Sequence, residues 1–222
     1  MSKLEQKYIK LINDRYTRRL DVHGNSPKAL GWSSVNQQQT RFERFNKYLP
    51  TNLQTITDIG CGFGDFASFL SSTNYQAPIK YVGVDINPNL LEVASSRQYS
   101  IDTQFFCGDI LEEKFCKSLK SLKHELVIAA GIFNLNFYEN QFMMRDFLFS
   151  MLNAMANLDP SRIIFDFIPS ERNDSYPIED YIAVYEISGL ISYLNSRHYG
   201  YVIDLMQAPN PMTEALLVID LK

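Results

Sequence analysis

Residues 56–64 have the sequence Ile56-Thr57-Asp58-Ile59-Gly60-Cys61-Gly62-Phe63-Gly64. The first half predicts a short buried strand, and the three glycines at alternate positions predict a tight turn that leads into a helix. Glycine permits the unusual φ angles of such a turn and leaves the backbone open to a ligand. Because the start of the following helix adds unpaired N–H donors, the pattern favours a site for a nucleotide-like ligand.

The residue after the turn narrows the choice of ligand. A dinucleotide fingerprint, G-x-G-x-x-G, would place its third glycine at Asp65, and the Walker pattern would need Gly-Lys-Ser/Thr, which this turn lacks. A carboxylate at this position repels a pyrophosphate and attracts an ammonium or sulfonium group. The turn therefore predicts a cationic ligand rather than NAD, with a ligand-free tight connection as the alternative when the motif is taken alone.

Composition limits the class of protein. A chain of 222 residues with 45% hydrophobic content fits one globular domain spanning residues 1–222. The net charge of -4 and the lack of a long basic run make nucleic acid an unlikely partner. Cys61, Cys107 and Cys116 have no metal-ligand spacing, so we expect free thiols in a reducing compartment and no metal. With no apolar signal region and no apolar run of membrane length, a cytoplasmic protein without membrane contact is expected.

Short apolar segments alternate with helix-length segments after residue 54. Strands are expected at 55–59, 80–84, 103–107, 126–130 and 162–167, and helices at 89–98, 139–158 and around 178–195. Asn87 and Pro88 are a cap and first-turn pair for the helix at 89–98. This order predicts a parallel sheet covered on both faces. Two further strands at 201–206 and 215–221, joined by a turn at 207–211, predict a hairpin at the sheet edge.

The first fifty residues differ from this pattern. Apolar residues at three- and four-residue steps predict an amphipathic helix over 3–20, turn residues fill 21–34, and a second helix is expected at 36–48, before Pro50. We therefore expect a helical extension over 1–50 and a ligand-binding core over 51–222.

Further candidate ligand contacts follow the second and fourth strands. Asp85 ends the second strand 21 residues after Gly64, where an acid can accept hydrogen bonds from both ribose hydroxyls; an aspartate that only begins a helix is the alternative. Ile86 beside it would offer an apolar face to a base. Ala130 closes the fourth strand with a small side chain, which lets a ligand approach the backbone.

With Asp58 and the glycines at 60, 62 and 64, the turn resembles motif I of the class I S-adenosylmethionine-dependent methyltransferases, and the element order extends this resemblance over roughly residues 40–222. It implies a Rossmann-like, seven-stranded, mostly parallel sheet with an antiparallel C-terminal edge hairpin, helices on both faces, and S-adenosyl-L-methionine as cofactor. It also implies that Asp109 accepts from the adenine amino group, that Ile110 contacts the ring, and that the edge at Ala130 faces the methionine amino group. Cys61 belongs to the same turn and is expected among the cofactor contacts.

The acceptor is less defined than the cofactor. Neither Asn/Asp-Pro-Pro-Tyr nor Pro-Cys follows the fourth strand, so the resemblance does not extend to enzymes that methylate amino groups of adenine, cytosine or glutamine, or cytosine C5. We expect methyl transfer to a small molecule. The alternatives are a non-catalytic S-adenosylmethionine sensor or scaffold and an aminopropyltransferase, although the latter would be expected to bring acids where this chain has residues 134–136, Asn-Leu-Asn. The oligomeric state is not predicted.

The extension over residues 1–50 is the candidate for a substrate lid. We expect its polar and aromatic residues His23, Trp32, Gln38 and Arg41 to lie over the cofactor, with Arg41 pairing with the methionine carboxylate or a substrate anion. The alternative is that Trp32 caps the core and Arg41 is solvated. If a general base is used, His23 and Tyr138 are the candidates, whereas His124 is expected to be structural.

Overall fold

The structure is a computed structural model that describes residues 3–73, 80–138, 140–171, 180–206 and 214–221. Its helices are α1 (Lys3–His23), α2 (Val35–Asn46), α3 (Asp65–Ser72), α4 (Pro88–Ser96), α5 (Glu113–Leu119), α6 (Gln141–Ala156) and α7 (Ile187–Ser196), with short 3-10 helices η1 (Pro27–Leu30) and η2 (Lys120–Leu122). Its strands are β1 (Thr55–Ile59), β2 (Lys80–Asp85), β3 (Asp102–Cys107), β4 (Leu126–Ala129), β5 (Arg162–Phe167), β6 (Gly200–Met206) and β7 (Glu214–Asp220).

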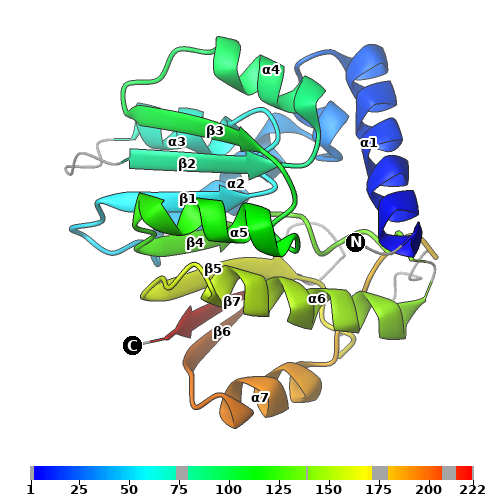
Figure 1. The fold of residues 1–222 in the computed structure, drawn as a ribbon, viewed down its shortest axis with the longest axis vertical. Helices are drawn as coiled ribbons and strands as arrows, with labels where there is room; N and C mark the ends of the chain where they lie inside the picture. Colours follow the sequence, from blue (N-terminus) through cyan, green and yellow to red (C-terminus); the bar gives the residue numbers. More distant parts are fainter. Residues whose placement is uncertain (1–2, 74–79, 139, 172–179, 207–213, 222) are drawn as a thin grey trace.

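The seven strands form one sheet in the order β3-β2-β1-β4-β5-β7-β6 (Figure 1). β1 to β5 are parallel to one another, and β7 runs antiparallel between β5 and β6. The chain builds the sheet outward from β1 to β3 and then returns to β4 on the other side of β1. In open α/β sheets, ligands bind beyond the carboxyl ends of the strands at such a reversal.

Helices cover both faces because the strands bury side chains on both sides. On one face, α5, α6 and α7 pack on positions such as Val82, Val127 and Phe165. On the other, α2, α3 and α4 pack on the alternate positions, such as Tyr81 and Ile128. The sheet is thus a rigid platform whose open edge is the carboxyl end of the strands.

Helix α1 lies across that edge (Figure 1). Its middle is tied to the start of α4, where Asn87 Nδ2 donates to Asn13 O at 3.2 Å and to Thr17 Oγ1 at 3.3 Å. Its C-terminal part is tied to η1, where Arg19 donates to the carbonyl oxygens of Lys28 and Ala29. Helix α1, from the N-terminal part of the chain, therefore covers the edge of the sheet at the carboxyl ends of the strands.

The predicted strands, the antiparallel hairpin and the N-terminal helices are confirmed, and Asn87 caps α4 as expected by accepting from the N–H groups of Asn89 and Leu90. Two helix boundaries were wrong. α1 continues to His23, which Gly24 (φ +60°) follows, so residues 21–23 are helical. α7 begins only at Ile187, because Ile182 and Tyr185 form bridges with Leu135 and Pro169.

The turn expected at residues 207–211 lies outside the described residues, and the division of the chain into domains stays a prediction. Within the described residues, none of the helices is both long and apolar enough to cross a membrane.

Candidate functional site

The glycine turn joins β1 to α3 in the predicted way. Gly60, Gly62 and Gly64 have φ angles of +76°, +53° and +69°, which other residues rarely adopt. The N–H groups of Gly60 and Cys61 donate to the carbonyl oxygen of Val84 at 2.7 and 3.1 Å, which holds the turn against β2. A Cβ on Gly60 would collide with Ile132, so this position needs glycine for space as well as for conformation.

Asp85 stands at the end of β2 beside the turn. Its Oδ2 accepts from Gly62 N at 2.9 Å and its Oδ1 accepts from Asn87 N at 2.8 Å, so the carboxylate connects the turn to the start of α4. Burial raises the pKa of Asp85, while the N–H groups of Asn87 and Gly62 lower it in part. Each carboxylate oxygen retains acceptor capacity for a ligand hydroxyl.

Asp58 lies in the middle of the same edge, on β1, and is buried. Tyr81 donates to its Oδ2 at 2.5 Å, whereas its Oδ1 is buried without a hydrogen-bond partner among the described residues. Burial raises the pKa of Asp58 to about 7, with smaller contributions from Asp85 and Asp65, and the hydrogen bond from Tyr81 opposes the shift. A cationic group beside Asp58 would favour its ionised form.

The carboxylate of Asp65, which was expected to attract a cationic ligand, is already paired within the protein. Its Oδ1 pairs with Arg97 at 2.5 Å, and its Oδ2 accepts from Gln38 Nε2 at 2.7 Å. Arg97 is the residue after α4, more than thirty residues along the chain, so the loops near Asp65 gave no sign of it. The negative charge of Asp65 is therefore balanced by Arg97.

A cavity of about 660 Å³ opens from the turn along the carboxyl ends of the strands. Its size is within the usual range of small-molecule sites. The predicted site residues that line it are Asp58, Gly60, Cys61, Gly62, Asp85, Ile86, Asp109, Ile110, Ala130, Trp32 and Tyr138, together with Gln38 of the predicted lid.

Three predicted residues do not line the cavity. Gly64 is the residue before α3, and a Cβ there would lie 2.5 Å from Tyr99 Oη, so this glycine serves packing of the helix on the sheet. His23 lies exposed in the last turn of α1, where its carbonyl accepts from Ser26 Oγ. A role of His23 as general base has no support in this arrangement.

Arg41 is the third residue away from the cavity, and it is not solvated. Its guanidinium is buried in ion pairs with Asp166 on β5 and Glu214 on β7, and it lies 5.4 Å from the centre of the Trp32 ring. Asp166 Oδ1 also accepts from Gly131 N at 2.6 Å. Burial, with a smaller effect of Arg44, lowers the pKa of Arg41 to about 9, so it stays charged at neutral pH. To pair with a ligand, Arg41 would have to leave these carboxylates.

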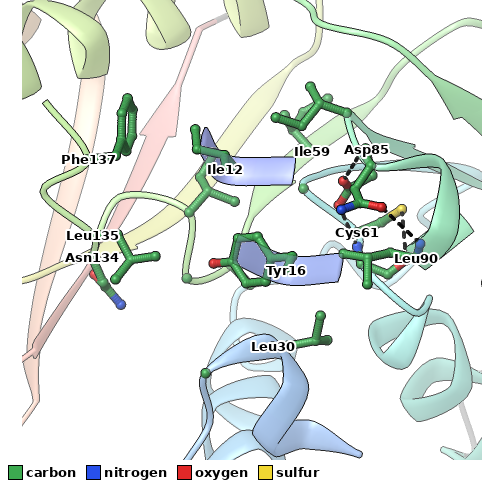
Figure 2. A pocket seen from close by; sticks show the side chains of 18 of the residues that line it. Ile12, Tyr16, Leu30, Ile59, Cys61, Asp85, Leu90, Asn134, Leu135 and Phe137 are labelled. Carbon is green, nitrogen blue, oxygen red and sulfur yellow. Dashed lines mark hydrogen bonds between the residues drawn. The ribbon is translucent and has the colours of Figure 1, made fainter. Parts of the chain in front are cut away.

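Helix α1 contributes side chains to the cavity that the sequence did not indicate. Tyr8, Ile12 and Tyr16 line it, and in Figure 2 Ile12 and Tyr16 lie between the group at Asp85 and the group at Leu135. The amphipathic pattern of residues 3–20 contained these positions, but it did not indicate which surface they would cover.

His124 is structural as expected, since its ring bonds Thr57 Oγ1 at 2.6 Å and Leu119 O at 2.7 Å.

Comparison with known proteins agrees with this geometry. Residues 56–154 match a sequence family described as a methyltransferase domain, whereas a comparison with curated proteins gave no match. The magnesium protoporphyrin IX methyltransferase from Synechocystis PCC 6803 with bound SAH is similar in structure, with a TM-score of 0.67 and 14% identity over 97% of this chain and 100% of that chain.

Two further solved structures have a similar fold. A SAM-dependent methyltransferase from Anabaena variabilis ATCC 29413 gives a TM-score of 0.63 at 14% identity, over 96% of this chain and 94% of that one. The small RNA methyltransferase HEN1 gives 0.60 at 14% identity, over 82% of this chain and 25% of that one. Residues 56–154 therefore match a methyltransferase domain, and the chain has the fold of the class I S-adenosylmethionine-dependent methyltransferases.

Proposed function

We propose that this protein transfers the methyl group of S-adenosylmethionine to a small-molecule acceptor by direct displacement. The observation that carries the proposal is the continuity of the cavity: it begins at the glycine turn and Asp85, and extends to Leu135, Phe137 and Tyr138 beyond β4. One continuous cavity thus offers room for a cofactor and for a second molecule beside it.

The residues at the turn fit an adenosyl ligand with a positive charge. Asp85 would accept from the ribose hydroxyls, Ile86 and Ile110 would contact the adenine, and the bare backbone at Gly60 and Gly62 would allow close approach. The buried Oδ1 of Asp58, which has no partner among the described residues, suits a cationic group at this edge. S-adenosylmethionine supplies an electrophilic methyl group on a sulfonium.

The chain's part in such a reaction is mainly alignment, which can supply much of the rate of a displacement. The acceptor atom bonds to the methyl carbon as the carbon–sulfur bond breaks, the bonding pair stays with sulfur, and a proton on the acceptor leaves to a side chain or water. Tyr138 lines the far part of the cavity and is the remaining candidate for a residue that receives or orients that proton. α1 lies across the carboxyl-end edge of the sheet and would limit the access of water to the site.

A small acceptor is favoured over RNA because the cavity has few free cations. Of the arginines that line it, Arg19 is bound to the carbonyl groups of η1, which leaves Arg15. Together with the net charge of -4, this gives little attraction for a phosphate backbone.

Two measurements test the proposal. Calorimetry should detect binding of S-adenosylmethionine and S-adenosylhomocysteine and weaker binding of NAD. Transfer of labelled methyl groups from S-adenosylmethionine into a cell extract, separated by size, should place the label in the low-molecular-weight fraction. Tighter binding of NAD would contradict the cofactor assignment, and label in RNA or protein would contradict the acceptor class.

A further inference from the structure

The cavity has two parts with different chemistry. Four lining carboxylates, Asp58, Asp65, Asp85 and Asp109, lie on or after β1, β2 and β3, on the side of the glycine turn, and the fifth, Glu214, begins β7. The other part, here called the acceptor half, lies between the N-terminal half of α1 and the segments after β4, and its walls include Tyr8, Ile12, Leu135, Phe137, Tyr138 and Ile182. Figure 2 shows Leu135 and Phe137 on the side of Ile12 that is away from Asp85.

The charged side chains that line the cavity away from the glycine turn are either bonded to other groups of the protein or exposed to solvent. Glu214 is paired with Arg41, and Arg19 is held by η1. Arg15 is exposed to solvent on α1, next to Tyr16. Within the part of the chain that the structure describes, the acceptor half therefore has no buried charged group to pair with a buried charge on a ligand, since Arg15 is exposed. An unpaired charge in such surroundings is strongly unfavourable.

The aromatic side chains of this half pack against one another. Ring centres are 4.2 Å apart for Tyr8 and Tyr138, 4.5 Å for Phe137 and Tyr138, and 5.0 Å for Phe137 and Phe147. Rings in mutual contact form a continuous apolar wall, whereas an aromatic cage for a cation has ring faces around an empty centre. The cluster also joins α1 to the loop before α6, so the wall exists only when α1 is in place.

We infer that the acceptor half binds an uncharged aromatic ring compound, and that Tyr8 and Ile12 of α1 determine this preference. The inference rests on the proposed function for the identity of the site as the acceptor site, but it makes a claim on ligand class that can be tested without turnover. Aromatic surface gains dispersion and hydrophobic energy against Tyr8 and Phe137, while an ammonium or carboxylate would lose its hydration there.

The test uses three probes with the same ring system: 2-naphthol, 2-naphthoate and 2-naphthylmethylammonium. Calorimetric titration into the full chain, with and without S-adenosylhomocysteine, should give binding of 2-naphthol about a hundredfold tighter than of either ion. Equal or tighter binding of one of the ions, or no binding of 2-naphthol under either condition, would overturn the inference.

Variants of α1 locate the binding. Ile12→Lys should weaken 2-naphthol about tenfold or more and strengthen 2-naphthoate, because it places a cation in the apolar wall. The matched control is Leu11→Lys on the same helix, since Leu11 is 45% exposed and does not line the cavity. Circular dichroism checks that both variants fold. Equal effects of the two variants would contradict the role of Ile12.

The two proposals fail separately. If S-adenosylhomocysteine does not bind but 2-naphthol still binds in an Ile12-dependent way, the proposed function is wrong and the apolar ligand class stands. If S-adenosylhomocysteine binds and 2-naphthol does not, the cofactor assignment stands and the ligand class is wrong.

Discussion

The two walls of the cavity are built from parts of the chain with opposite sequence character. The wall formed by β1, β2 and their loops carries a local motif, in which glycines and acids are spaced for a ligand. The wall formed by α1 carries only an amphipathic pattern that many surface helices share. The first wall can be recognised from spacing, and the second only from what it contacts.

The difference also appears in how the walls are held. The motif wall is fixed by backbone hydrogen bonds within the sheet, such as those from Gly60 and Cys61 to Val84. The N-terminal extension is fixed by side chains, above all by Arg41 between Asp166 and Glu214, and by Asn87 against α1. We expect the motif wall to tolerate little change in backbone shape and the extension to depend on a few polar contacts.

The largest expected effect is on the contact that joins the extension to the sheet. Arg41→Met leaves Asp166 and Glu214 without their cation, and it should lower the free energy of unfolding by about 4 kcal/mol, because removal of one partner of a buried ion pair leaves an uncompensated charge. Urea denaturation measures this. Arg145→Met is the control: its pair with Asp146 on α6 is exposed, and its loss should cost about 1 kcal/mol or less. Similar losses in both variants would mean that the extension is a peripheral addition.

The second effect is specific to the motif wall and depends on pH. With a pKa of about 7 in the folded protein and 3.8 as the ordinary value, Asp58 binds more protons in the folded state than in the unfolded state between these limits. Its contribution to stability is therefore complete below pH 3.8 and is lost as the pH rises through 7.

Asp58→Asn removes this titration and keeps an acceptor for Tyr81. Relative to the variant, the natural protein should lose about 2 kcal/mol of unfolding free energy between pH 5 and pH 7. Urea denaturation at several pH values gives both curves. Parallel curves would show that Asp58 is ionised throughout, and that this wall is more polar than its burial indicates.

The sequence predicted what short segments determine. The glycine turn, the strand ends at Asp85 and Asp109 and the cap at Asn87 are local patterns, because each depends on residues within a few positions of one another. The seven-stranded, mostly parallel sheet and its antiparallel edge followed from the resemblance to a known family, whereas the hairpin was also indicated by its two strands and short turn.

The rest depends on contacts between distant positions. Arg41 and Glu214 are 173 residues apart, and no local feature of α2 indicates that an arginine there would be buried on β5 and β7. Arg97 reaches Asp65 across 32 residues. The apolar stripe of α1 was visible, but an amphipathic stripe does not specify which surface it covers. α7 begins further along the chain than expected. Ile182 and Tyr185, which precede it, form bridges with Leu135 and Pro169, and these contacts override their local preference for a helix.

A smaller effect is expected at Asp85, within the motif wall. Asp85→Asn turns one acceptor toward a backbone N–H into a donor and removes the charge, so affinity for S-adenosylhomocysteine should fall about thirtyfold by calorimetry. Asp102→Asn is a control at the opposite end of β3, where the side chain is exposed and affinity should not change. Unchanged affinity in Asp85→Asn would mean that the motif acts only through its backbone.

The smallest expected effect concerns the α1 wall. Tyr16 lines the cavity between its two parts, and burial raises the pKa of its hydroxyl, which stays neutral. Tyr16→Ala should weaken S-adenosylhomocysteine about tenfold, since it removes apolar contact area, and Tyr16→Phe should change affinity little. Arg18→Ala, on the exposed side of the same helix, is the control for both. If Tyr16→Phe lowers the affinity for S-adenosylhomocysteine as much as Tyr16→Ala does, the hydroxyl rather than the ring contacts the ligand. If neither variant loses affinity, α1 covers the acceptor alone, and the division between the two walls would coincide with the division between cofactor and acceptor.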